Sequence, residues 1–222
     1  MPERDSMQNR SVMTIGAIVT AGLLQAQGPG MNNAAWMKFQ DKLTPVKEYS
    51  ATLVMEVSGQ TITSKMFQSG KKTRTEIATQ GMQIISITDP EADDGKGAMY
   101  MLMPVMKTYT KMPFPADAAG QADKEPDIKI EEIGKEDVDG VSCDKRRVTI
   151  TADGKEQVMT MWLSAAAKNM PVKMEMAAPT AVVIKYKDYD FKKPSADLFT
   201  VPADYKANAM MNLGGGAPTI KQ

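Results

Sequence analysis

The stretch that decides the fold reads Glu48-Tyr-Ser-Ala-Thr-Leu-Val-Met-Glu-Val-Ser58. Every second residue from Tyr49 to Val57 is apolar, while serine, threonine and glutamate occupy most positions between them. Successive side chains of a β-strand point to opposite faces, so a period of two places the apolar residues on one face. The stretch therefore predicts a half-buried strand, and the sequence after it repeats the pattern.

Ten further segments have strand-like composition and are separated by glycine, proline and aspartate turns. They are predicted at residues 61–68, 72–78, 82–88, 98–103, 105–111, 128–133, 141–151, 155–163, 172–177 and 180–191. Short connections favour antiparallel neighbours, and Asp139-Gly140 and Asp153-Gly154 are typical hairpin turns. A sheet of about eleven strands curls strongly. We therefore predict a mainly β fold with a few helices, built on a strongly curved antiparallel sheet, a half-barrel.

The one long helix is predicted at residues 32–43, where Pro45 prevents continuation. Trp36, Phe39 and Leu43 fall at near-helical spacing and form one apolar stripe. We expect this N-terminal helix to pack on the sheet. A short helical turn is expected at residues 164–169, and Pro104 marks a turn or a sheet edge. Residues 113–127, rich in proline and alanine, are expected to form a loop or lid.

The N-terminal residues have the three parts of a secretory signal. Arg10 is followed by an uncharged apolar run at residues 12–24, and we expect cleavage after Ala26. The run has 13 residues, fewer than the roughly 20 of a spanning helix. An uncleaved anchor and a buried helix are the alternatives, and translation could start at Met1 or Met7. No cysteine follows the run, so no lipid anchor is expected.

The expected organisation is a signal peptide at residues 1–26, one domain at 27–206 and a flexible tail at 207–222. The exported product is predicted to be periplasmic and soluble, with no transmembrane segment after cleavage. The sequence contains no histidine and one cysteine, which excludes Ser-His-Asp and Cys-His catalysis, imidazole metal sites and an intrachain disulfide. The 27 basic residues balance the 27 acidic ones, so nucleic-acid binding is not expected. No cofactor is predicted.

Methionine is strongly enriched, with 20 copies, and several occupy alternate positions of predicted strands. Three interpretations stay open for these stripes: ordinary core packing, the wall of an apolar ligand cavity, and a Cu(I) site, since thioethers are soft and deformable. The candidate cavity residues are Trp36, Phe39, Leu53, Met55, Met99, Met101, Met103, Met159, Met161, Trp162, Met174 and Met176.

Four other motifs have plainer interpretations. Cys143 is expected to be buried in a strand, with intermolecular pairing as the alternative. The acidic run 89–95 lacks the glycine and glutamate spacing of a calcium loop and predicts a solvated hairpin turn. Glu131 and Glu132 are adjacent strand residues that point to opposite faces, so they are assigned to the surface. The basic residues 145–147 are predicted on a solvated strand face.

The segment 134–145, Gly-Lys-Glu-Asp-Val-Asp-Gly-Val-Ser-Cys-Asp-Lys, has a recognisable pattern. It resembles the "GkE-V-G-xx-C-xK" segment of an uncharacterised bacterial envelope domain family, related to the outer-membrane lipoprotein-sorting (LolA/LolB-like) superfamily. Met161-Trp162-Leu163, residues 171–174 and the ending at 198–205 are similar to that family in order and spacing. The resemblance spans about residues 47–206.

This resemblance implies an unclosed, curved antiparallel sheet that encloses an apolar cavity, which holds acyl chains in the sorting proteins. No functional residue of the sorting carriers matches a position here. The leading hypothesis is a non-enzymatic envelope protein that binds an apolar ligand, either a lipid or a lipidated protein. The alternatives are a copper-binding protein that uses the methionines and an envelope protein–protein interaction module.

Overall fold

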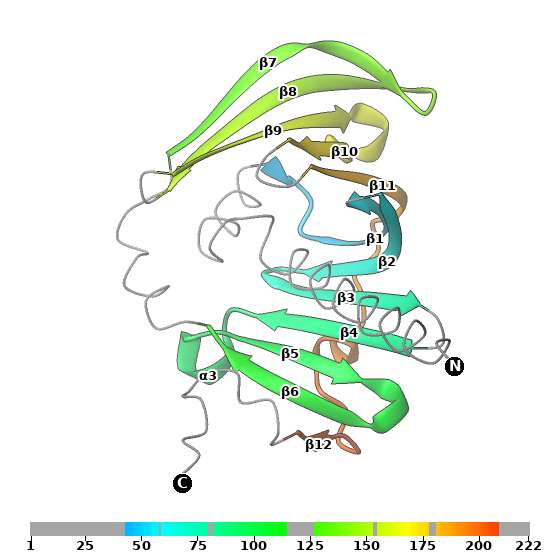
Figure 1. Cartoon of the computed structure of the whole chain (residues 1–222), viewed down its shortest axis with the longest axis vertical. Helices are drawn as coiled ribbons and strands as arrows, with labels where there is room; N and C mark the ends of the chain where they lie inside the picture. Colours follow the sequence, from blue (N-terminus) through cyan, green and yellow to red (C-terminus); the bar gives the residue numbers. More distant parts are fainter. Residues whose placement is uncertain are drawn as a thin grey trace, which may run out of the picture.

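The fold is one twelve-stranded sheet in the order β12-β6-β5-β4-β3-β2-β1-β11-β10-β9-β8-β7 (Figure 1). The computed structural model describes residues 43–57, 59–79, 82–114, 127–152, 155–177 and 181–208. The strands are β1 (Glu48–Val57), β2 (Gln60–Ser69), β3 (Lys72–Thr79), β4 (Met82–Asp89), β5 (Ala98–Met103), β6 (Thr108–Pro113), β7 (Asp127–Val138), β8 (Val141–Ala152), β9 (Lys155–Ser164), β10 (Met170–Met176), β11 (Val182–Asp190) and β12 (Lys206–Ala207).

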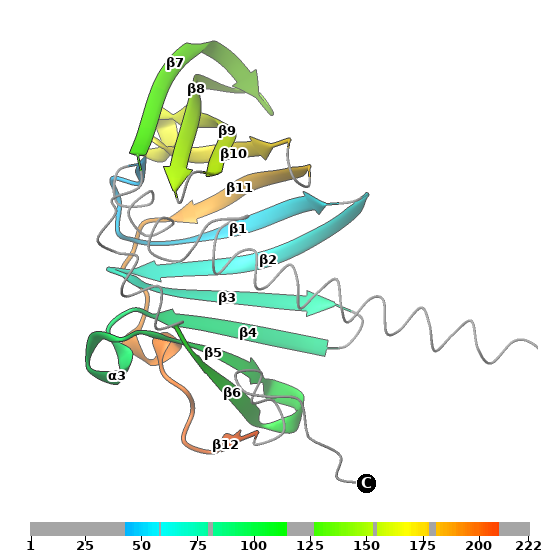
Figure 2. The same cartoon turned by 60° about the vertical axis from the view of Figure 1, so that its left-hand side comes forward.

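The sheet is curved and open, as the view in Figure 2 shows, and β7 and β12 form its two edges. All neighbouring strands are antiparallel except β12 and β6, which are parallel. Between β4 and β5 lies α3 (Ala92–Gly95), and three short 3-10 turns follow further along the chain. These are η1 (Pro104–Met106), η3 (Ala165–Ala167) and η4 (Ala196–Phe199). The predicted class, a mainly β fold on a curved antiparallel sheet, is confirmed.

The first and last long strands of the meander, β1 and β11, pair side by side in the middle of the sheet. This pairing divides the sheet into a half made of β2–β6 and a half made of β7–β11, with β1 between them. The two halves are consecutive in the chain, and only the β1–β11 pair joins them among the described strands.

Two predicted strands needed correction, and one strand was missed. The segment 105–111 begins as a 3-10 turn after Pro104, and Lys107 has a positive φ of 49°, so β6 starts only at Thr108. The predicted strand 128–133 continues to Val138, because Gly134 (φ 131°) forms a bulge that preserves the pairing with β8. The two-residue β12 was not predicted at all, since a strand that short carries no periodicity, and the count is twelve rather than eleven.

The predicted turns agree with the structure where it describes them. Asp139 and Gly140 both have positive φ, the geometry of a two-residue hairpin turn, between β7 and β8. Pro104 starts the turn between β5 and β6, and η3 lies within the helical turn predicted at 164–169.

Several predictions lie outside the described residues. These are the signal peptide at 1–26, Trp36 and Phe39 of the predicted helix, most of the loop 113–127, the turn at 153–154 and most of the tail. Of the predicted helix only Leu43 is described; it is helical and buried in the core. Within the described ranges, no helix is long and apolar enough to cross a membrane.

Candidate functional site

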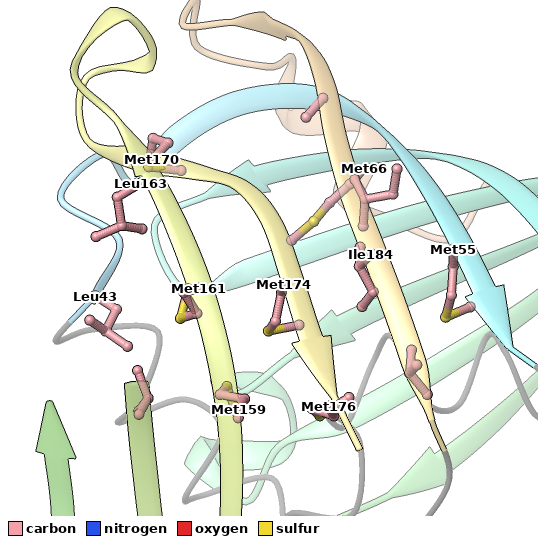
Figure 3. Close-up of a cluster of buried hydrophobic side chains, with 14 of the residues drawn as sticks. Leu43, Met55, Met66, Met159, Met161, Leu163, Met170, Met174, Met176 and Ile184 are labelled. Carbon is pink, nitrogen blue, oxygen red and sulfur yellow. The ribbon is translucent and has the colours of Figure 1, made fainter. Parts of the chain in front are cut away.

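A large cluster of buried apolar side chains covers one face of the sheet around β1 and β8–β11. Seven of its sixteen buried residues are methionines: Met55, Met66, Met159, Met161, Met170, Met174 and Met176. Figure 3 shows that those on β1, β9 and β10 project to the same side as Ile184 of β11. We call these seven residues the methionine patch, and the side of the sheet that carries them the methionine face.

The strand register builds the centre of the patch. Met161 lies directly opposite Met174, and Met159 lies opposite Met176, on the neighbouring strands β9 and β10. Side chains of directly opposed residues have Cβ atoms roughly 5 Å apart and therefore touch. Ile184 of β11 lies opposite both Met174 and Met55, so it links this group of four to the central strand. The sequence stripes thus meet across strands to form one thioether-rich surface.

An aromatic group packs against the same cluster. The ring of Tyr189 lies 5.7 Å from that of Tyr49 and stacks on Phe191 at 5.4 Å. It also stacks on Tyr186 at 6.4 Å. Tyr186 and Tyr189 share a face although they are three positions apart in the sequence, because β11 bulges where Asp188 has φ 52°. Alternation alone would have separated these rings, which is why sequence reasoning missed them.

Burial dominates the electrostatics of these tyrosines. It raises the pKa values of Tyr49, Tyr186 and Tyr189 well above the ordinary value of a phenol. The Tyr189 hydroxyl donates a hydrogen bond of 2.7 Å to the Pro171 carbonyl oxygen. The aromatic group therefore stays uncharged at physiological pH and gives the methionine patch an apolar border.

The methionine face continues across β2–β6 but changes in character. In the register, Ala51 and Met66 lead to Thr75, Ser86, Met101 and Thr110 on successive strands. Met101 and Met99 are buried on this face and Met103 is half-buried. These three methionines alternate with Tyr100 and Leu102, which point the other way, as the predicted stripe requires. Met101 lies between Ser86 and Thr110 and Met103 lies opposite Thr108, whereas Met99 lies between Thr88 and another methionine, Met112.

Trp162, a predicted cavity residue, lies on the opposite face, which we call the tryptophan face. It follows Met161 in β9 and so points the other way, where it packs with Val138, Cys143 and Val172. The Nζ atoms of Lys145 and Lys173, directly across on β8 and β10, lie 5.0 Å and 4.4 Å from its ring centre. The structure therefore separates Trp162 from the methionine patch.

Cys143 is buried in a strand, as predicted, and lies beside Trp162. Its Sγ donates to the Val141 carbonyl oxygen at 3.1 Å. Burial raises the pKa of its thiol. The prediction that residues 145–147 share a solvated face is wrong, because alternation divides them. Lys145 is on the tryptophan face, whereas Arg146 lies between Met161 and Glu132 on the methionine face.

The acidic run 89–95 forms the predicted hairpin connection between β4 and β5. Lys72 pairs with Asp89 at 2.8 Å, and Lys111 pairs with Asp93. In the part of the chain that the structure describes, no group of three or more His, Cys, Asp or Glu side chains could hold a metal ion. Glu131 and Glu132 lie on opposite faces of β7, in agreement with the prediction.

The structure thus brings together six of the predicted site residues. Leu53, Met55, Met159, Met161, Met174 and Met176 belong to the buried cluster. Sequence reasoning missed Met66 and Met170, which are single methionines outside any stripe, and the aromatic group. Met66 is two residues from Ser64 and Gln68 on its strand, so its own segment carries no apolar signal.

Comparisons with solved structures find similar chains at low identity. An uncharacterised conserved protein from Thermus thermophilus is 9% identical with a TM-score of 0.51, covering 80% of this chain and 99% of that one. MucB in the MucA/MucB complex of Pseudomonas aeruginosa is 13% identical with a TM-score of 0.43, covering 76% of this chain. This chain spans 61% of that MucB chain. A LolA superfamily protein from Nitrosomonas europaea is 10% identical with a TM-score of 0.33, covering 74% and 95% of the two chains.

A comparison with curated proteins finds no match. One family model, for a domain of unknown function, covers residues 49–170. That range runs from β1 to the start of β10 and contains the strands β8 and β9 of the methionine face. It is more than half of the chain, so the sequence-based expectation of an uncharacterised domain family is confirmed. The chain belongs to the DUF4412 family.

Proposed function

We propose that the methionine face binds an apolar, acyl-chain-bearing ligand, and that the chain acts as a non-catalytic binding protein of the bacterial envelope. The predicted export signal supports the location. The resemblance to the lipoprotein-sorting superfamily, which was noted from the sequence, supports a ligand with acyl chains. The proposal itself rests on the chemistry of the methionine patch.

The observation that carries the proposal is the concentration of methionine on one face. An ordinary core is built mainly from leucine, isoleucine and valine, whose rotamers are well defined. Methionine is unbranched and polarizable, so a surface rich in it adapts its shape to flexible apolar partners. Here four methionines of β9 and β10, Met159, Met161, Met174 and Met176, oppose one another in pairs, bordered by stacked tyrosines. Such a surface suits an alkyl chain that adopts many conformations.

A binding role is favoured over catalysis by the reactive groups that the chain carries. The sequence has no histidine. Its one thiol, Cys143, faces away from the methionine patch, and the raised pKa of that thiol keeps it protonated. The three tyrosines at the patch are held neutral by burial. The face that we propose for the ligand therefore offers contacts rather than a reactive group.

The second candidate is a Cu(I) site, and the same four methionines favour it. Met159, Met161, Met174 and Met176 form two directly opposed cross-strand pairs, and soft thioether ligands select Cu(I). Titration with Cu(I) against a chromophoric chelator separates the two functions. The double variant Met161→Leu with Met174→Leu preserves apolar volume but removes two sulfurs, so it should abolish copper uptake and leave acyl binding within a few-fold.

The main experiment is displacement of a fluorescent fatty-acid probe from the full chain, with native mass spectrometry to count bound lipids. Met174→Gln places a polar group of similar shape in the patch and should weaken probe binding about tenfold or more. Met174→Leu should bind within about threefold of the parent chain. The matched control is Val158→Gln, at an exposed apolar position on the tryptophan face of β9. Equal binding by all three variants, each shown to be folded by thermal unfolding, would contradict the proposal.

A further inference from the structure

On β2–β6 the methionine face carries a row of hydroxyls that the acyl-binding role leaves unexplained. Thr75, Ser86 and Thr110 lie in one row across β3, β4 and β6, with Met101 of β5 between the last two. All three hydroxyl residues are buried. We call Thr75, Ser86 and Thr110 the hydroxyl patch. The same row runs on through Met66, so the hydroxyl patch adjoins the methionine patch without a break.

Two members of this patch have no hydrogen-bond partner in the part of the chain that the structure describes. Ser86 and Thr110 are each 6% exposed, and neither Ser86 Oγ nor Thr110 Oγ1 is hydrogen-bonded to any residue that the structure describes. Burying a hydroxyl without a partner costs about 1–3 kcal/mol, so such groups are uncommon in a finished core. Nearby polar groups are satisfied: Gln68 donates to the Gly70 carbonyl oxygen at 2.7 Å and accepts from Thr73 at 2.8 Å. The two unpaired hydroxyls are therefore a feature of this row and not of the whole half.

The hydroxyl patch is also uncharged. Alternation places Lys65, Arg74, Glu76 and Lys111 of these strands on the tryptophan face. Among the described residues of β2–β6, the positions on the methionine face are serine, threonine, glutamine, methionine and isoleucine. An anionic headgroup would need a cation beside it, because a buried unpaired charge is far more costly than a buried hydroxyl. The patch matches a polar group that has no charge.

We propose that the hydroxyl patch receives the uncharged polar end, an ester or hydroxyl group, of an amphiphile whose acyl chain lies on the methionine patch. The inference rests on the proposed function and names the class of ligand: a neutral lipid such as an acylglycerol. Ser86 and Thr110 donate to its oxygen atoms. The two residues are separated by one strand, so their Cα atoms lie roughly 10 Å apart, and each serves a different oxygen of the ligand.

The test compares three ligands of equal chain length on the full chain: monopalmitoylglycerol, palmitate and hexadecane, each displacing the fluorescent probe. We expect monopalmitoylglycerol to bind at least tenfold more tightly than either of the others. Ser86→Ala and Thr110→Val should each weaken its binding about threefold to tenfold, the effect of one lost hydrogen bond, and leave hexadecane unchanged. Both variants remove an unpaired hydroxyl, so both should fold at least as stably as the parent chain.

The matched control is Thr52→Val, because Thr52 lies on the tryptophan face of β1, opposite Lys65 and Lys187. Equal affinity for the three ligands, tighter binding of palmitate, or unchanged ester binding in both hydroxyl variants would overturn the inference while leaving the acyl-binding function in place. Displacement by none of the three ligands would overturn the proposed function and this inference with it.

Discussion

The two halves of the sheet carry their larger apolar clusters on opposite faces. In β7–β11 the larger apolar cluster lies on the methionine face, and the tryptophan face has a smaller cluster around Trp162, over which Lys145 and Lys173 lie. In β2–β6 the larger apolar cluster lies on the tryptophan face, where Phe199 of η4 packs on Ile85, Ile87 and Leu102. The methionine face of that half holds the hydroxyl patch.

Because the larger apolar clusters lie on opposite faces, the methionine face has a different role in each half. The η4 segment anchors β3–β5 from the tryptophan face, and Arg74 Nη1 holds it by donating to the Leu198 carbonyl oxygen at 2.8 Å. Because that half is stabilised from one side, its other face is free to carry hydroxyls instead of a second core. In the β7–β11 half, Leu43, Val46 and Ala167 pack against the methionine cluster from outside the strands. The proposed binding surface of this half uses the same methionines that stabilise it. Substitutions in the β2–β6 half should therefore change either stability or binding, whereas substitutions of the methionines in the β7–β11 half should change both.

The largest effect on stability is expected at Phe199, which packs over the apolar cluster of the β2–β6 half. Phe199→Ala should lower the free energy of unfolding by about 3–5 kcal/mol, because it leaves a cavity between η4 and the sheet. Urea unfolding measures the loss. Leu198→Ala, at a half-buried neighbour, is the control and should have a clearly smaller effect. A loss below about 1 kcal/mol for Phe199→Ala would show that η4 is not the anchor.

In the β7–β11 half the corresponding position is Met174, which is fully buried at the centre of the methionine patch. Met174→Ala should lower the free energy of unfolding by about 2–5 kcal/mol, and Met174→Leu by less than about 1.5 kcal/mol. Chemical unfolding of both variants provides the comparison. If the leucine variant were as unstable as the alanine variant, the patch would be rigidly packed, and its adaptability to a ligand would be in doubt.

High pH should destabilise the protein through the tyrosines at the methionine patch. Burial raises the folded-state pKa values of Tyr49, Tyr186 and Tyr189 above those of the unfolded chain. Their stabilising contribution is therefore complete below about pH 10, and it is lost as the pH rises above that value, where the unfolded chain ionises.

Tyrosinate absorbance measured alongside circular dichroism tests this expectation. Three of the six tyrosines should ionise only as the fold is lost. Smooth ionisation of all six while the sheet remains intact would contradict the burial of the aromatic group.

The smallest expected effect is an increase in the free energy of unfolding. Ser86→Ala removes a buried hydroxyl without a partner among the described residues, so it should raise the free energy of unfolding by about 1 kcal/mol. Thermal unfolding of the ligand-free chain measures it, with Ser142→Ala at an exposed position as the control. A loss of stability would mean that Ser86 is already hydrogen-bonded in the folded protein, and the hydroxyl patch would no longer need a ligand.

The sequence by itself determined the strands, most of their turns and the chemical inventory. Alternation around Leu53 and Met55 is a local property of the chain, and so is the positive φ that Asp139-Gly140 supplies at a hairpin. The lack of histidine excluded whole classes of active site. The stripes at 159–161 and 174–176 also indicated which methionines share a face, because a period of two fixes relative orientation within one strand.

Only the tertiary structure decided which strands meet and which face is covered. Alternation does not say that β1 pairs with β11, nor that Phe199 covers the tryptophan face of β3–β5, since both contacts join segments that are far apart in the sequence. Bulges at Gly134 and near Asp188 change the face to which the following residues point. Tyr189 therefore lies on the methionine face, although a strict period of two would place it on the other face. The hydroxyl patch likewise exists only through the register of separate strands, because its members are ordinary serines and threonines within each strand.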